Sequence, residues 1–203
     1  MRAILVLLTL ALPAVAQTLT FMKSFPGSVP PYVEINLQPD GKGEYKEDPK
    51  DENPVGFTLP KEDMDVLFGL AAKLDHFSRT LESGLKVANM GAKTFRWQEA
   101  SKKQDAVFNY TEDPDGKVLW DWFERIADSE RAHIDLERTV KFDKLGVQAA
   151  ILRVEVLRDE KRWTAPQQYL PLLDRVAKNE SYLHMARTRA AALADEIRKI
   201  KTQ

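Results

Sequence analysis

Two side chains in the stretch "FERIADSERAHIDLE", residues 123 to 137, have the spacing of metal ligands. Glu130 and His133 stand three residues apart in a segment with helical periodicity, so they share one helix face. Glu-x-x-His is the pair that helices contribute to carboxylate-bridged metal centres. Glu180 and His184, four residues apart, are the nearest second pair. The chemistry to consider is therefore metal binding, for storage or for catalysis.

The two pairs are too far apart to share one ion. If the chain reverses near residues 164 and 165, His184 faces the neighbourhood of Leu145, roughly 18 Å from His133 at 1.5 Å per residue. Bonds from a metal to a histidine nitrogen are about 2 Å long. The heptad phase instead places His133 in a helical seam, so we assign no metal ligand. A metal-binding protein or hydrolase that uses Glu130 and His133 remains the alternative from another functional class.

Other catalytic patterns are missing from the sequence. The stretch "NMGAKT" lacks the spacing of a phosphate-binding loop, and there is no Gly-x-Ser-x-Gly or His-Glu-x-x-His motif. The chain has no cysteine, which excludes disulfides, thiolate metal sites and cysteine nucleophiles. We therefore expect no catalytic residue and no cofactor, although a carboxylate pair in the N-terminal domain stays open as a hydrolytic acid and base.

The first sixteen residues have the layout of a secretory signal peptide. Arg2 precedes an apolar run from Ala3 to Leu12, and Ala14 and Ala16 give a small-x-small pattern. The apolar run is about half as long as a membrane-spanning helix requires. This predicts cleavage after Ala16 and export, to a bacterial periplasm or the outside, without an integral membrane segment. The net charge of −1 and the interleaved signs in "RVEVLRDEKR" do not suggest a nucleic-acid partner.

Residues 17–116 are expected to form a small α+β domain. "PYVEINL" alternates apolar and polar residues, and a Pro-Asp-Gly turn leads from it to a second strand. "KTFRWQEA" and "DAVFNYT" alternate in the same way around a polar turn. Between these hairpins, residues 58–77 have helical spacing, with Pro60 near the start. The pattern predicts two β-hairpins, forming a four-stranded antiparallel sheet, with one packed helix.

Residues 117–203 are expected to form a long antiparallel α-helical hairpin of the coiled-coil type. One heptad phase runs from Lys117 to Trp163, and a second apolar stripe begins at Pro166. At 1.5 Å per residue these helices would be about 69 Å and 52 Å long. The first would overshoot the second and pack its beginning on the N-terminal domain. Gly146 does not change the phase, which leaves either a kink or a helix end open there.

Five residues receive interaction or structural roles. Trp122 and Ile126 are expected to dock the start of the long helix on the N-terminal domain. Asp143 faces Arg187 in the hairpin register, which predicts an ion pair. Asn179 is expected to be a polar seam residue that fixes register.

These features predict an exported, non-enzymatic cell-envelope protein that acts as a protein-interaction or structural module through its helical hairpin. The partner would be another protein or a second copy of the chain, because Ile151 and Val156 lie off the main seam. A periplasmic chaperone-like holder of unfolded clients is the alternative within the binding class.

Overall fold

The computed structural model describes residues 17–200, and the predicted signal peptide, residues 1–16, lies outside this range. Its elements, in chain order, are β1 (Gln17–Ser24), β2 (Tyr32–Leu37), β3 (Lys42–Lys46), β4 (Val55–Thr58), α1 (Lys61–Lys73), η1 (Asp75–Phe77), β5 (Ala92–Glu99), β6 (Lys102–Phe108), α2 (Pro114–Phe142), α3 (Val147–Asp159), η2 (Pro166–Tyr169), α4 (Leu170–Lys178) and α5 (His184–Ile200). The strands precede most of the helices, and the predicted α+β class is confirmed. No helix between residues 17 and 200 is both long and apolar enough to cross a membrane.

The six strands form one antiparallel sheet in the order β4-β3-β2-β1-β5-β6. β1 lies at the centre, where Phe21 is opposite Ile35 of β2 and Phe95 of β5. Successive side chains of a strand point to opposite faces. The inward positions of neighbouring strands therefore align into one apolar face.

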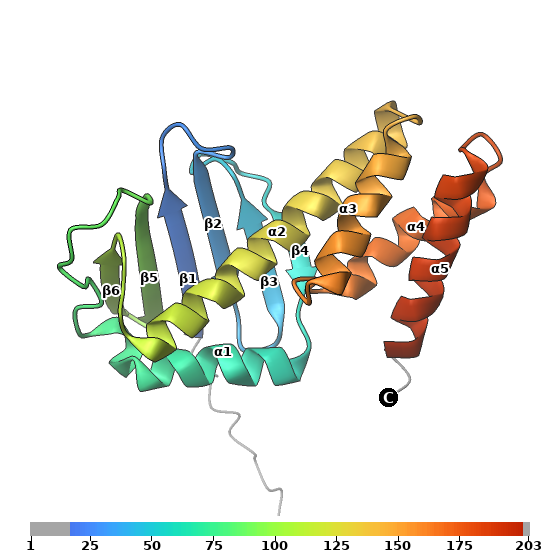
Figure 1. Cartoon of the computed structure of the whole chain (residues 1–203). Coiled ribbons are helices and arrows are strands. Elements are labelled where there is room, and N and C mark those ends of the chain that lie inside the picture. Colours follow the sequence, from blue (N-terminus) through green and yellow to red (C-terminus); the bar gives the residue numbers. More distant parts are fainter. Residues whose placement is uncertain (1–16, 201–203) are drawn as a thin grey trace, which may run out of the picture.

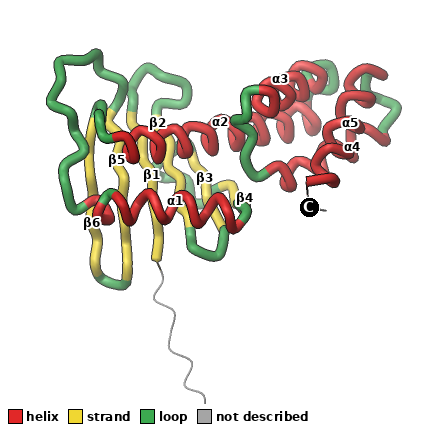
Figure 2. The backbone as a smooth tube through the Cα atoms, turned by 60° about the horizontal axis from the view of Figure 1, so that its bottom comes forward, coloured by secondary structure: helices red, strands yellow, loops and turns green. Residues whose placement is uncertain are grey.

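Helices α1 and α2 cover that face of the sheet, as Figure 2 shows. Leu119, Phe123 and Ile126 of α2 are fully buried against the strands. The ring of Phe123 stacks on Phe21 with centroids 4.9 Å apart, a contact worth about 1 kcal/mol beyond its buried area. The start of α2 is thereby fixed to the sheet.

The second half of α2 leaves the sheet and joins α3, α4 and α5 in a helical bundle (Figure 1). Its Leu136 and Val140 pack with Val154 of α3, Leu173 of α4 and Leu193 of α5 in a separate apolar core. One helix thus contributes to two cores. We refer to the two parts as the sheet lobe and the bundle lobe.

The predicted four-stranded sheet is wrong in strand number, because β1 and β4 were not anticipated. In β1, Leu19 and Phe21 alternate with polar Thr18 and Thr20, but the stretch directly follows the predicted signal peptide. β4 has only four residues, including Gly56, and such short edge strands carry little pattern. The two predicted hairpins are part of the sheet, and β1 joins them.

The predicted helical hairpin is only partly right, because the first long helix ends at Phe142, which is the helix end left open at Gly146. Asp143 leaves the helical region with φ −138° and ψ 83°, and its Oδ1 accepts a hydrogen bond from the Gly146 amide at 3.0 Å. A Cβ on Gly146 would meet Asp143 Oδ2 at 2.3 Å, so a larger residue there would displace the Asp143 carboxylate from this hydrogen bond. α3 then runs back along α2. The heptad phase continues across the turn because Val140 and Val147, seven residues apart, are buried in the same core.

The predicted second helix is divided as well. Asn179 ends α4 in an extended conformation, and its Oδ1 accepts from the Ser181 amide at 2.9 Å, so it is no seam residue. The predicted ion pair between Asp143 and Arg187 does not form. Asp143 caps the α2–α3 turn, whereas Arg187 Nε donates to the Ala177 carbonyl at 3.4 Å.

Replacing Asp143 tests this turn against the predicted ion pair. Asp143→Ala should lower the free energy of unfolding by about 1 kcal/mol, because an Asp side chain that caps a backbone amide contributes roughly that much. Arg187→Ala should change it by less than about 0.5 kcal/mol. Urea denaturation of both variants and of the double variant should give additive effects. A coupling above about 0.5 kcal/mol would restore the ion pair.

Candidate functional site

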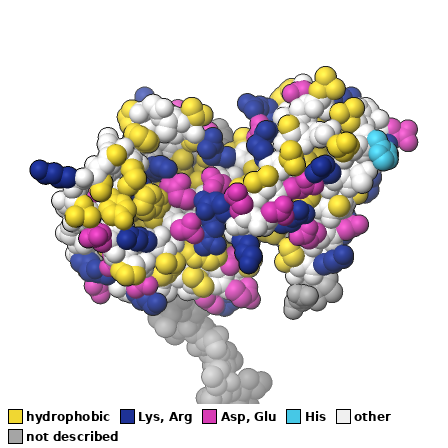
Figure 3. All heavy atoms as spheres, in the orientation of Figure 1, with side chains coloured by type: hydrophobic (Ala, Val, Ile, Leu, Met, Phe, Trp, Pro, Cys, Tyr) yellow, Lys and Arg dark blue, Asp and Glu magenta, His cyan; other side chains and the backbone are white. Residues whose placement is uncertain are grey.

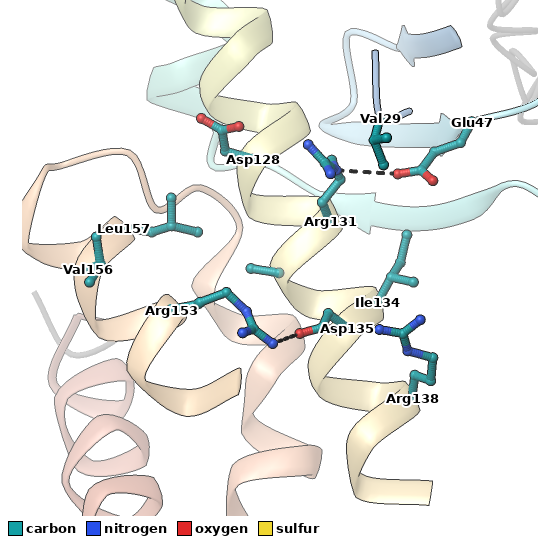
Figure 4. A pocket seen from close by; sticks show the side chains of 11 residues that line it. Val29, Glu47, Asp128, Arg131, Ile134, Asp135, Arg138, Arg153, Val156 and Leu157 are labelled. Carbon is teal, nitrogen blue, oxygen red and sulfur yellow. Dashed lines mark hydrogen bonds and ion pairs between the residues drawn. The ribbon is translucent and has the colours of Figure 1, made fainter. Parts of the chain in front are cut away.

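A groove runs along α2 where this helix passes from the sheet lobe to the bundle lobe (Figure 4). α2 provides its floor, α3 one wall, and the β1–β2 loop with the residue after β3 the other. The cavity volume is about 860 Å³. A smaller hollow of about 80 Å³ adjoins it and shares Val29, Asp128 and Arg131. We call the larger feature the interlobe groove.

Three arginines and three carboxylates line the interlobe groove. At its centre, Asp135 of α2 pairs with Arg153 of α3 and accepts from Arg138 Nη2 at 2.6 Å. Burial raises the pKa of the Asp135 carboxyl, but the hydrogen bonds from Arg153 and Arg138 outweigh it, and the net pKa lies below the ordinary value. Asp135 is therefore a fixed anion that ties α3 to α2.

The other two carboxylates also have guanidinium partners. Arg131 Nε lies 3.6 Å from Glu47 Oε1, and Glu47 accepts from the Tyr45 hydroxyl at 2.8 Å. Asp128 Oδ2 accepts from Arg162 Nε at 2.9 Å and from Nη2 at 2.8 Å. All three carboxylates of the groove therefore lie against arginine side chains. In Figure 3, basic and acidic side chains gather across the middle of the molecule, between the lobes.

The rims of the groove combine aliphatic and cationic surface. Val29, on the β1–β2 loop, is 83% exposed, and Val156 of α3 is 45% exposed. The arginine side chains remain partly in solvent, from 42% for Arg131 to 71% for Arg138. A guanidinium carries five N–H donors, so each arginine retains donors for a further anion.

Behind the groove, α2 contacts the α3–α4 connection through a cluster of buried and half-buried polar side chains. We call it the junction cluster: Ser129, Glu130, His133, Thr164, Gln168 and Tyr169. Ser129 Oγ donates to the Thr164 carbonyl at 2.7 Å, and the Tyr169 hydroxyl donates to the Ser129 carbonyl. Gln168 Nε2 donates to Glu130 Oε1 at 2.6 Å.

Glu130 and His133, the metal candidates, both belong to the junction cluster. Glu130 is fully buried and lies against Gln168, while the half-buried His133 ring makes an edge contact with Tyr169 at 5.1 Å between centroids. Burial lowers the pKa of His133, although the charge of Glu137 opposes this. His184, from the second pair, is exposed at the start of α5. Within residues 17–200 no three His, Asp or Glu side chains gather as a metal site.

Trp122 and Ile126 lie where the sequence placed them. Ile126 is fully buried in the core of the sheet lobe, and Trp122 packs against that core half-exposed. The guanidinium of Arg125 lies 3.8 Å from the Trp122 ring centroid, a cation–π contact. Both residues therefore hold α2 on the sheet rather than line the interlobe groove.

Lys93 is a buried charged residue that the sequence analysis did not single out. Burial and then the positive charge of Lys23 lower its pKa to about 8. Its Nζ donates to three carbonyls, those of Met90, Gly91 and Asn109, and lies 4.3 Å from the Trp120 ring centroid. All three ammonium protons are used, so Lys93 is a structural clamp rather than a catalytic amine. The strand alternation that points Phe95 inward would have revealed it.

The fold and this groove define an α+β protein with a cleft between a sheet and a helical bundle. Comparison of the chain with protein-family models, curated proteins and solved structures gave no match. The functional argument therefore comes from the site alone.

Replacing Asp135 tests the electrostatics of the groove. Because the pKa of Asp135 is lowered in the folded state, its contribution to stability is present above the unfolded pKa and is lost as the pH falls through the folded one. Asp135→Asn should cost about 1 kcal/mol near pH 7 and should flatten the loss of stability below about pH 4. Urea unfolding at several pH values measures both effects.

Asp159→Asn is the matched control, since Asp159 also pairs with an arginine but its side chain is 67% exposed. It should cost less than about 0.5 kcal/mol. Equal losses for the two variants would mean that the Asp135 pairs are no stronger than ordinary surface ion pairs.

Proposed function

We propose that the protein is an exported, non-enzymatic binding module of the cell envelope, and that its interlobe groove holds a segment of a partner protein. The observation that carries this proposal is the lining of the groove, which combines the exposed Val29 and Val156 with partly exposed arginines. Arginine is enriched at protein interfaces, and the buried centre of an interface is more apolar than its rim. The export component rests on the sequence of residues 1–16 alone.

The dimensions of the groove favour an extended peptide. From Asp128 to Arg138 the floor on α2 is ten residues, roughly 15 Å long. A peptide in this groove would place apolar side chains against Val29 and Val156 and acidic groups toward the arginines. The proposed interaction site is therefore the groove, which replaces the projecting hairpin of the sequence prediction.

The state of the carboxylates supports binding over acid–base catalysis. A general acid or base works best when its pKa is near the operating pH. The pKa of Asp135 is shifted the other way, and Asp128 and Glu47 are engaged by Arg162 and Arg131. Groups of this kind orient a ligand rather than exchange protons with it.

Site-specific photo-cross-linking tests the proposal. A photoreactive residue at Val156 should give a discrete cross-linked protein when the chain is exported by its own cells, because Val156 lines the groove. The control position is Val66 of α1, which is 46% exposed against 45% for Val156 but lies outside the groove. Asp135→Asn should weaken the Val156 product. Equal products at both positions, or none at Val156, would reject the groove as the binding site.

The chaperone-like alternative is favoured by a different surface. At the α2–α3 turn, Phe142 is 83% and Leu145 78% exposed, and at the α4–α5 turn Met185 is 54% exposed. Gln148 Nε2 lies 3.2 Å from the Met185 sulfur, which places both turns at the same end of the bundle lobe. Exposed apolar patches mark interaction sites, and the partner in this alternative is an unfolded chain.

Replacing Phe142 and Leu145 with serine tests that alternative. If the turn binds clients, the double variant should lose the ability to suppress aggregation of an unfolded model protein, measured by light scattering. Its melting temperature should stay close to that of the wild type because both side chains are exposed. Unchanged suppression, or none in the wild type, would remove the alternative and leave the groove.

A further inference from the structure

The buried carboxyl of Glu130 lies at the point where α2 passes between its two cores. Ala127, one turn before it, belongs to the core of the sheet lobe, and Ala132 belongs to that of the bundle lobe. Glu130 itself is fully buried. A carboxyl group in such a place is costly unless it is neutral or has a full set of hydrogen bonds.

Glu130 and Gln168 together lack one hydrogen-bond donor. Gln168 Nε2 donates to Glu130 Oε1 at 2.6 Å, which satisfies one oxygen. Glu130 Oε2 and Gln168 Oε1 are both buried without a donor. An ionised carboxylate only accepts, whereas a protonated one has an O–H to donate. A proton on Oε2 would supply the missing donor for the Gln168 oxygen.

The surroundings of Glu130 favour that proton. The titratable groups coupled to it are Tyr169 of η2 and Tyr45 of β3, and His133, one turn along its own helix, packs against Tyr169. Burial lowers the pKa of His133, and the pKa values of both tyrosines are raised, by burial first, so none of the three offers a cation. Burial raises the pKa of Glu130 to about 7, and the Gln168 hydrogen bond opposes this only in part.

We propose that protonated Glu130 and the Gln168 carboxamide form a ring of two hydrogen bonds, and that loss of this proton releases the α3–α4 connection from α2. In the ring, Gln168 Nε2 donates to Glu130 Oε1 and Glu130 Oε2 donates to Gln168 Oε1. Ionisation removes the second bond and leaves a buried negative charge beside an acceptor oxygen. The fold therefore contains a pH-sensitive latch that is closed below neutral pH and opens above it.

The latch acts on a segment that positions much of the bundle lobe. Residues 160–169 connect α3 to α4 and are also held by the ion pairs of Arg162 with Asp128 and Asp121. Those ion pairs do not include Glu130, so the contact that changes with its proton is the one to Gln168. Opening thus loosens the connection at Gln168 while Arg162 remains attached.

Hydrogen exchange across the connection tests the latch. In Glu130→Gln the new amide can make both ring hydrogen bonds but has no proton to lose. The ratio of exchange rates in residues 160–169, wild type over Glu130→Gln, should rise by at least about tenfold between roughly pH 5 and pH 8, since one pKa unit is tenfold in population. Comparison at each pH cancels the intrinsic pH dependence of exchange. A constant ratio would overturn the proposal.

The free energy of unfolding should change with pH in the corresponding direction. Because the folded pKa lies above the unfolded one, the wild type should lose stability relative to Glu130→Gln as the pH rises from the unfolded pKa to about 7, and should then run parallel to it. Glu137→Gln, a change at a partly exposed side chain two turns further along α2, should keep the wild-type loss of stability between the unfolded pKa and about pH 7.

Direct titration of the glutamate carboxyl groups in the wild type tests the latch even if a variant folds poorly. With carbon-13-labelled glutamate, one side-chain carboxyl should titrate near neutral pH, and its signal should be missing in Glu130→Gln. Titration of every glutamate in the ordinary range would refute the latch.

Discussion

One helix must bury its two halves in different environments, and the rest of the structure depends on that constraint. The first half of α2 presents Leu119, Phe123 and Ile126 to a sheet, and the second half presents Leu136 and Val140 to three helices. A helix cannot bend freely between two rigid cores. The relative placement of the lobes, and hence the shape of the groove, is therefore fixed by where along α2 one core ends and the other begins.

Local patterns in the sequence are sufficient to predict much of the secondary structure of the sheet lobe. The alternation around Ile35 and Phe95 gave two hairpins, and the spacing of Leu67, Leu70 and Leu74 gave α1, because one buried face imposes its period on each element. β1 was missed because its alternation is short and adjoins an apolar leader. Its central place depends on pairing with strands on both sides, which no local window of sequence contains.

In the bundle lobe the apolar pattern is clear, but the path of the chain is not. Most of its apolar seam residues are buried, but Ile151, which was expected on an outer flank, is also buried in this core. An apolar period records burial and not chain direction. A four-residue turn between Phe142 and Val147 keeps the phase, so two separate helices have the same pattern as one continuous helix. The deciding signals were the side chains of Asp143 and Asn179, which bind nearby backbone amides and end helices.

The candidate site could be predicted only in fragments for the same reason. Glu130 stood out from its spacing to His133, yet its partner is Gln168, thirty-eight residues away. The groove joins α2, α3 and the β1–β2 loop, and its ion pairs, such as that of Arg153 with Asp135, depend on the reversal at Gly146. An ion pair between an arginine and an acid four residues apart on one helix can be predicted from sequence. An ion pair that forms because a turn brings two helices together cannot.

The groove and the latch share α2 but face different sides of it. At 100° per residue, Glu130 lies roughly 140° around the helix from Asp135. A ligand in the groove cannot touch Glu130, so any coupling must pass through a segment that contacts both. The α3–α4 connection does so, since Arg162 binds Asp128 at the groove and Gln168 binds Glu130. Thermodynamic linkage is reciprocal: if proton loss at Glu130 weakens binding in the groove, occupation of the groove must favour the protonated carboxyl by the same factor.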